Sequence, residues 1–271
     1  MKAARFDYAR PATLGEALKL IAEVPDAKLL AGGQSLGPML NLRLAQPTLI
    51  VDITRIAELA EVTEEAEAIS FGASITHAAI EDGRVTDPTG GFLARVAAGI
   101  GYRAVRTKGT VGGSLAHADP AADWLTALTA LDAELVLASR SGRRRVPLAG
   151  FVAGAMQTGL RSDELIAAVR IGKCSPRARF GYHKVCRKVG DFADAIAAAV
   201  ADPDRGLSRI VASTPAGAPI VVAADAATIA APPEIAALER RLSEAKFSGD
   251  AYDKRLRAVV LKRALEAMTR R

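Results

Sequence analysis

The sequence contains the stretch Ala31-Gly32-Gly33-Gln34-Ser35-Leu36 and, about 80 residues later, the stretch Thr110-Val111-Gly112-Gly113-Ser114-Leu115-Ala116-His117. Each follows a short apolar or basic run and leads into a segment that can become helical. Paired glycines let a main chain approach a ligand closely and turn its N–H groups toward an anionic phosphate. Two such loops suit a ligand whose two phosphates are held from both sides, which predicts a dinucleotide.

The spacing of the glycines excludes the two commonest nucleotide motifs. The doubly wound dinucleotide fingerprint needs G-x-G-x-x-G between a strand and a helix, whereas Gly32, Gly33 and Gly37 read G-G-x-x-x-G. The mononucleotide motif G-x-x-x-x-G-K-S/T does not occur in the sequence. Either loop alone is equally well explained as an ordinary turn, because glycine pairs are common in turns. Two similar loops with hydroxyl and amide side chains beside the glycines favour phosphate binding.

The composition is that of a globular protein. The 271 residues are 50% hydrophobic and 24% charged, enough for one large or two modest domains. Cys174 and Cys186 form no C-x-x-C pair, so this chain alone predicts no iron–sulfur cluster, and its three scattered histidines predict no metal site. The N-terminus lacks the apolar core of a signal peptide, so we expect a cytoplasmic protein without a structural disulfide.

The basic charge has two explanations. The net charge is +6 and the isoelectric point is near 9.5, which is compatible with nucleic-acid binding. However, the densest basic group, Arg143 to Arg145 with Arg140, surrounds a Ser141-Gly142 turn and is expected on a solvated hairpin. Aromatic residues are only 4% of the chain, too few for a base-stacking surface. The charge therefore favours acidic partner subunits over nucleic acid.

The first part of the chain predicts a small β-α-β unit over residues 1–55. A capping box at residues 13–16 begins a helix whose apolar face is Leu14, Ala17, Leu18 and Ile21. Strands are predicted over residues 28–31 and 49–53. Pro38 suits the first turn of a short helix between them.

The next region, residues 56–173, predicts a mixed or antiparallel sheet with helices. Strands are expected over residues 68–73, 134–139, 144–148 and 164–171, and helices over residues 76–82, 91–98 and 119–131. In the last helix, Asp119 is the expected N-cap and Pro120 the first helical residue. Its buried stripe is expected to be Trp124, Leu125, Leu128 and Leu131.

Residues 174–271 predict a smaller domain of antiparallel sheet and C-terminal helices. The expected strands cover residues 178–185, 195–200, 207–213 and 219–223, and the expected helices cover residues 233–244 and 250–268. The fold class is therefore α+β. It combines a two-part domain over residues 1–173 with a second domain that begins near Cys174-Ser175-Pro176.

Several motifs make the sequence similar to a known family. They are Pro38-Met39-Leu40-Asn41-Leu42-Arg43-Leu44 and Val51-Asp52-Ile53 after the first loop, Arg106-Thr107-Lys108-Gly109 and Asp119-Pro120-Ala121-Ala122-Asp123 around the second, and Arg187-Lys188-Val189-Gly190-Asp191-Phe192-Ala193. With the two loops, these resemble the FAD-binding medium subunits of molybdenum hydroxylases, the family of carbon monoxide dehydrogenase and xanthine dehydrogenase. The resemblance extends to about residue 200 and returns in the last thirty or so residues, whereas residues 205–235 match poorly.

The resemblance implies a FAD-carrying electron-transfer subunit. A large partner subunit would hold the molybdenum cofactor and hydroxylate the substrate with water. A small partner subunit would carry two 2Fe–2S clusters that pass electrons to FAD, which hands them to an external acceptor. The assembly would be a dimer of heterotrimers, and the residues that select the substrate would lie in another chain.

The resemblance also implies which residues contact FAD. They are Ala31, Gly32, Gly33, Gln34, Ser35 and Leu36 in the first loop, Thr110, Gly112, Gly113 and Ser114 in the second, and Asp123, Ile166 and Lys184. His117, adjacent to the second loop, is a further candidate that either touches the flavin or only packs. Backbone N–H groups of both loops would neutralise the pyrophosphate, and the hydroxyls of Ser35, Thr110 and Ser114 would donate further bonds. Many family members have Asn or Cys in place of Ser114, which keeps a small polar group there.

Three of the remaining polar positions carry alternatives. Asp123, one turn into its predicted helix, is either a solvated residue favoured by the helix dipole or, as the resemblance implies, a cofactor contact. A cation near the pyrimidine end of the flavin would stabilise its anionic reduced form, and the register leaves both Lys184 and His183 open for this role. His77 is expected to face solvent on its helix.

No nucleophile elbow, catalytic triad or zinc motif occurs in the sequence, so the chain has no evident acid–base machinery for a substrate. A self-contained FAD-dependent oxidase or reductase is the alternative function. It requires catalytic residues in the C-terminal domain, which is rich in alanine and poor in Tyr, His and Asn. A flavin-free scaffold that keeps only the fold is a third possibility, and it predicts a colourless protein.

Overall fold

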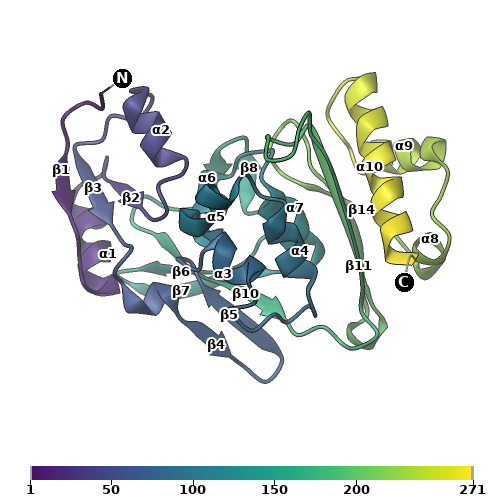
Figure 1. Cartoon of the computed structure of the whole chain (residues 1–271), viewed down its shortest axis with the longest axis horizontal. Coiled ribbons are helices and arrows are strands. Elements are labelled where there is room, and N and C mark those ends of the chain that lie inside the picture. Colours follow the sequence, from purple (N-terminus) through teal and green to yellow (C-terminus); the bar gives the residue numbers. More distant parts are fainter. Residues whose placement is uncertain (1, 270–271) are drawn as a thin grey trace.

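A computed structural model describes the chain over residues 2–269. Sheets of three, five and four strands follow one another along the chain. Figure 1 shows them in sequence from the purple N-terminal unit to the yellow C-terminal helix, with helices between the second and third sheets. The predicted α+β class is confirmed.

The N-terminal unit is a parallel three-stranded sheet in the order β1-β3-β2. Its elements are β1 (Asp7–Ala9), α1 (Leu14–Glu23), β2 (Lys28–Leu30), α2 (Leu36–Asn41) and β3 (Leu49–Asp52). Helix α1 begins as predicted because Thr13 and Glu16 form a complete capping box. The β-α-β unit is confirmed, and β1 adds one strand that the sequence did not predict.

The central sheet has five antiparallel strands in the order β4-β5-β10-β6-β7. They are β4 (Val62–Glu64), β5 (Ala68–Gly72), β6 (Glu134–Ser139), β7 (Gly142–Pro147) and β10 (Leu165–Gly172), preceded by the short helix η1 (Ala57–Ala60) and interrupted by β8 (Val152–Gly154) and β9 (Gln157–Thr158). The β6–β7 hairpin carries the arginines, as predicted; Arg140, Arg143 and Arg145 are exposed, whereas Arg144 is half-buried and pairs with Glu164 at 2.7 Å.

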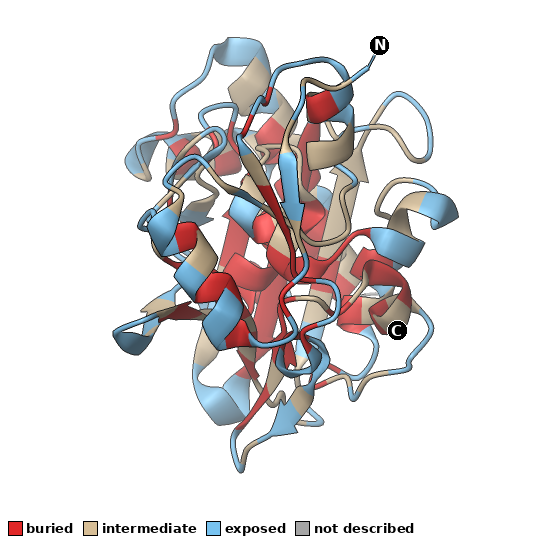
Figure 2. Cartoon of the chain, turned by 90° about the vertical axis from the view of Figure 1, so that its left-hand side faces the viewer, coloured by how far each residue is buried: buried red, intermediate tan, exposed pale blue. Residues whose placement is uncertain are grey.

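Five helices lie above this sheet in Figure 1. They are α3 (His77–Glu81), α4 (Phe92–Ala98), α5 (Arg103–Lys108), α6 (Val111–His117) and α7 (Asp123–Ala130). Every residue of α7 is buried. Its Trp124 and Leu128 belong to one continuous core that includes Val169 of β10 and Val200 of the next sheet. Helix α7 therefore packs between two sheets, and Figure 2 shows this buried interior in red.

The C-terminal part is an antiparallel sheet in the order β11-β12-β13-β14, covered by helices. The elements are β11 (Arg179–Val185), β12 (Ala195–Asp202), η2 (Pro203–Arg205), β13 (Leu207–Ala212), β14 (Ile220–Val222), α8 (Ala226–Ala230), α9 (Ile235–Glu244) and α10 (Ala251–Thr269). A Cβ on Gly181 of β11 would lie 2.7 Å from the Ala264 carbonyl carbon, so the glycine allows α10 to pack directly on the strand. The predicted sheet and the two closing helices are confirmed.

The start of α7 corrects two expectations. Asp119 is not the N-cap and Pro120 is not helical, because the helix begins at Asp123 with Ala122 as its cap. The Asp119 carboxylate instead accepts a hydrogen bond from the Ala121 N–H, 2.8 Å away, within a turn. An aspartate that closes a turn and one that caps a helix use the same side-chain bond to the backbone, so the sequence alone does not separate them.

Candidate functional site

The two glycine-rich stretches lie against each other. A Cβ on Gly32 would lie 2.6 Å from the Lys108 carbonyl carbon and 2.8 Å from the Gly109 Cα, so only glycine permits this approach. A Cβ on Gly113 would lie 3.9 Å from the Cβ of Ala31. Segments about 80 residues apart in the sequence therefore lie side by side in the fold.

The first loop presents backbone donors. Within the described residues, no hydrogen-bond partner is found for the N–H groups of Gly32, Gly33, Gln34 and Ser35. The Gln34 side chain donates to the Gly32 carbonyl oxygen at 2.9 Å, and Gly33 has a φ of +69°, so the loop is fixed in a conformation that favours glycine. Successive backbone donors beside the start of α2 are suited to phosphate oxygens. The loop fits the pyrophosphate of FAD.

The second stretch uses its backbone differently from our expectation. The Gly112 N–H donates to the Ala73 carbonyl at 2.9 Å, the Gly113 N–H to the Thr110 hydroxyl at 3.1 Å, and the Ser114 N–H to the Thr110 carbonyl at 3.0 Å. These three groups are the first turn of α6, capped by Thr110. The prediction that they neutralise the pyrophosphate through their N–H groups is wrong. The half-buried Ser114 hydroxyl is the group in this stretch that fits a phosphate.

A short antiparallel pairing holds the second stretch in place. Thr76 forms a bridge with Thr110, the His77 N–H donates to the Gly109 carbonyl at 2.9 Å, and the Val111 N–H donates to the Ile75 carbonyl at 3.0 Å. The protein thus fixes residues 109–112 before any ligand binds.

Asp123, Tyr182 and Lys184 form a second polar cluster. The Lys184 ammonium donates to the Asp123 Oδ1 at 2.8 Å and to the Gly99 carbonyl at 2.6 Å, and the Tyr182 hydroxyl donates to the same Oδ1. Burial raises the pKa of the Asp123 carboxyl, while Lys184 and Tyr182 oppose that rise. Burial and the Asp123 carboxylate raise the pKa of Tyr182 well above its usual value. The cluster is a buried ion pair with a neutral donor beside it.

The cluster separates Lys184 from His183. Neighbouring residues of a strand point to opposite faces of the sheet, and His183 lies beside Arg263 of α10, with its Nε2 3.3 Å from the guanidinium nitrogen. Burial and Arg263 lower the pKa of His183. Lys184 faces α7 and Asp123. Asp123 is the first residue of that helix, not one turn into it, and it is buried.

Tyr182 is a residue that the sequence reading missed. It stands two positions before Lys184 on β11, and strand periodicity places both side chains on one face. That spacing is the signal that could have identified it.

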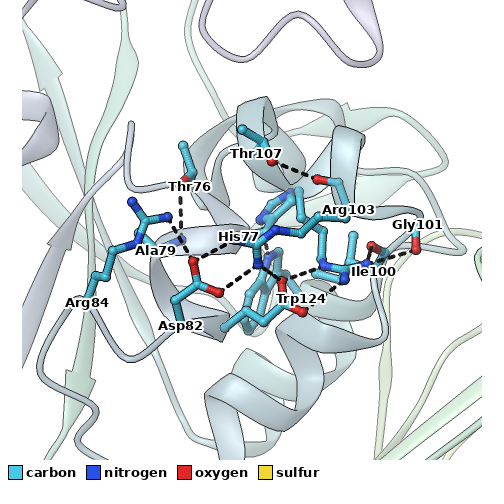
Figure 3. Close-up of polar contacts among 12 residues, drawn as sticks. Thr76, His77, Ala79, Asp82, Arg84, Ile100, Gly101, Arg103, Thr107 and Trp124 are labelled. Carbon is cyan, nitrogen blue, oxygen red and sulfur yellow. Dashed lines mark hydrogen bonds and ion pairs between the residues drawn. The ribbon is translucent and has the colours of Figure 1, made fainter.

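His77 corrects a further expectation. Its side chain does not face solvent: it is 5% exposed, and its Nδ1 accepts a hydrogen bond from Trp124 Nε1 at 3.0 Å. Burial and the nearby Arg106 lower the pKa of His77 to about 4, so the ring is neutral at physiological pH. Figure 3 shows this contact among the polar residues of α3 and α5.

The other three predicted FAD contacts differ in burial and lie on different elements. Leu36 begins α2 and is half-buried beside the first loop. His117 is the half-buried last residue of α6. Ile166 is 5% exposed within the central core of β10. The contact of these three residues with FAD stays a prediction.

The described part of the chain contains no group of His, Cys, Asp and Glu residues that could hold a metal ion. Cys174 and Cys186 are both free thiols. Among the helices formed by residues 2–269, none has the length and apolar character needed to cross a membrane.

Comparisons with known proteins identify the family. Residues 4–174 match the family of the FAD binding domain in molybdopterin dehydrogenase. The chain is 38% identical to the caffeine dehydrogenase subunit beta of a Pseudomonas strain over 73% of this chain and 68% of that protein. It is also 38% identical to the carbon monoxide dehydrogenase medium chain of Hydrogenophaga pseudoflava over 72% of this chain and 69% of that protein.

Solved structures agree along the whole chain. A chain of the carbon monoxide dehydrogenase from Hydrogenophaga pseudoflava superimposes with a TM-score of 0.88 at 34% identity, covering 99% of this chain and 98% of the other. A chain of quinoline 2-oxidoreductase from Pseudomonas putida 86 gives 0.81 at 28% identity, with the same coverage. This protein is therefore a flavoprotein oxidoreductase chain, and it belongs to the family of FAD-binding subunits of molybdopterin dehydrogenases.

Proposed function

We propose that this chain is the FAD-carrying electron-transfer subunit of a cytoplasmic molybdenum hydroxylase. The main observation is the contact between the two glycine-rich stretches, where Gly32 lies directly against Lys108 and Gly109 and leaves four backbone donors of the first loop available. The proposed FAD-binding domain covers residues 1–173, and residues 174–271 form the C-terminal domain that contributes Lys184.

The chain's own residues would bind and orient the cofactor. The N–H groups of residues 32–35 and the hydroxyls of Ser35 and Ser114 would hold the pyrophosphate. Lys184, fixed by Asp123 and the Gly99 carbonyl, would place positive charge near the ring system. FAD, when bound, supplies the redox chemistry that side chains lack.

The substrate chemistry would belong to partner subunits. Proteins named as a caffeine dehydrogenase subunit and as a carbon monoxide dehydrogenase chain are equally identical to this chain, which supports substrate selection elsewhere. A large subunit with the molybdenum cofactor and a small subunit with two 2Fe–2S clusters would complete a heterotrimer, and two heterotrimers would form the assembly.

Purification of the native assembly tests this function. The absorption spectrum should contain flavin and iron–sulfur bands, and the three chains should co-purify. The isolated chain should bind one non-covalent FAD, released completely by acid, and oxidise no substrate. Steady turnover by the isolated chain would support the self-contained flavoenzyme, and a colourless assembly would support the scaffold.

A further inference from the structure

His77 lies where the two parts of the proposed site meet. Its backbone N–H bonds the Gly109 carbonyl at 2.9 Å, and its ring accepts the Trp124 indole N–H at 3.0 Å. Trp124 directly follows Asp123 in α7. One residue therefore contacts both the segment that packs on the first loop and the helix turn that carries the buried carboxylate (Figure 3).

The ring of His77 also sets the position of the 108–109 backbone. A Cβ on Gly109 would lie 2.9 Å from both Cδ2 and Nε2 of His77, so the ring occupies the space beside this glycine. The adjoining Lys108 carbonyl is the group against which Gly32 packs. A shift of the imidazole would therefore be transmitted through Gly109 to the first loop, because buried groups in contact do not move independently.

The surroundings keep His77 in one protonation state and one orientation. The indole N–H requires Nδ1 to be the acceptor, so the ring proton is assigned to Nε2. Arg106, the cation near the ring, is held by two bonds to Glu81 at 2.7 and 2.9 Å and by bonds of 3.1 Å to the carbonyls of Ile100 and Gly101. His77 is thus a fixed, neutral acceptor.

We propose that His77 is a positioning residue for FAD, which holds Gly109 through its backbone and ring and holds the start of α7, with Asp123, through Trp124. The proposal rests on the proposed function, since it concerns the same site. It does not require His77 to touch the cofactor.

Two substitutions that are isosteric with each other distinguish a positioning role of His77 from a role in core packing alone. His77→Asn places a carbonyl oxygen where Nδ1 lies and so keeps the acceptor for Trp124. His77→Leu has the same branching but no acceptor, which leaves a buried indole N–H unpaired. A residue that only filled the core would tolerate leucine at least as well as asparagine, because leucine is the more apolar side chain.

The experiment is a titration of the apo-chain with FAD, at a temperature where circular dichroism shows each variant to be folded. We expect the dissociation constant to be about tenfold higher in His77→Leu than in His77→Asn, because both variants lose the ring beside Gly109 and only asparagine keeps the acceptor for Trp124. Trp124→Phe, which removes the donor but keeps a buried ring, should also bind FAD more weakly than wild type.

Equal affinities for the asparagine and leucine variants would overturn the positioning role while the proposed function stands. An apo-chain of wild-type sequence that does not bind FAD would overturn the proposed function itself. The two failures are therefore distinguishable.

Discussion

The two glycine-rich stretches have similar compositions and use their backbones in opposite ways. In residues 32–35 the N–H groups have no hydrogen-bond partner within the described chain, whereas those of residues 112–114 all donate to the protein. Gly32 approaches the C-terminal end of α5, and Gly112 approaches the end of β5, where its Cβ would lie 2.7 Å from the Ala73 carbonyl oxygen. A glycine pair in a sequence thus indicates that another group packs closely against the main chain. It does not tell whether that group is a ligand or another part of the protein's own backbone.

The largest effect should come from the first loop. Gly33→Val should lower FAD affinity by about 100-fold or more while the chain stays folded, because a β-branched residue resists the observed φ of +69° and shields the N–H groups. Flavin content and circular dichroism measure the two effects. Gly37→Ala is the control, because nothing lies within 4 Å of its Cβ position. Equal flavin content in Gly33→Val and wild type would refute the phosphate assignment.

The second stretch should respond through stability. Gly112→Ala introduces a Cβ that collides with Ala73 of the chain's own backbone, and such overpacking costs about 1–3 kcal/mol. We expect a lower thermal midpoint of the apo-chain, measured by circular dichroism. Gly15→Ala in α1, where no atom lies within 4 Å, should not lower it. Equal thermal midpoints for the two variants would contradict the conclusion that the second stretch packs against the protein's own backbone.

The pH dependence of unfolding tests the burial of His77, the residue that holds Gly109 at the start of the second stretch. The folded pKa of His77 is about 4 and the ordinary value is 6.5, so the unfolded chain binds the proton more readily. His77 therefore costs nothing above pH 6.5 and destabilises the fold progressively as the pH falls toward 4. At pH 5 the loss is about 2 kcal/mol. Denaturant unfolding of His77→Asn should lack this component; an identical decline in both proteins would contradict it.

The smallest effect should come from the polar cluster of Asp123, Tyr182 and Lys184, which lies outside both glycine-rich stretches. Lys184→Met should leave FAD bound and lower the flavin potential by roughly 20–45 mV, corresponding to about 1–2 kcal/mol for one partly buried charge. A spectroelectrochemical titration measures the shift. His183→Ala is the matched control, because its side chain faces α10. A shift of the flavin potential in His183→Ala but not in Lys184→Met would show that His183, not Lys184, is the cation near the flavin.

Local signals were predictable from the sequence. The capping box at Thr13 and the β6–β7 hairpin each depend on neighbouring residues, and both are present. The predicted stripe of α7 is buried too, but the structure buries every other residue of that helix as well. Distant partners were not predictable. The burial of His77 depends on Trp124, 47 residues away. The Gly112 N–H was misread because its acceptor, the Ala73 carbonyl, lies outside the motif, and the Gly113 and Ser114 N–H groups were misread because the turn that they form with Thr110 is helical. Helix α6 was missed because its Gly112 and Gly113 argue against a helix, and α5 was missed because it is only six residues long.

The wholly buried helix α7 limits how this protein can be divided. Its apolar residues share one core with Val169 of the central sheet and with Ala198, Val200 and Val211 of the C-terminal sheet. A chain ending at residue 173 would expose that side of α7 to water, and the exposed apolar surface would promote aggregation. We therefore expect the central and C-terminal sheets to unfold as one cooperative unit. In evolution, the C-terminal domain could be exchanged only together with the residues of α7 that pack against it.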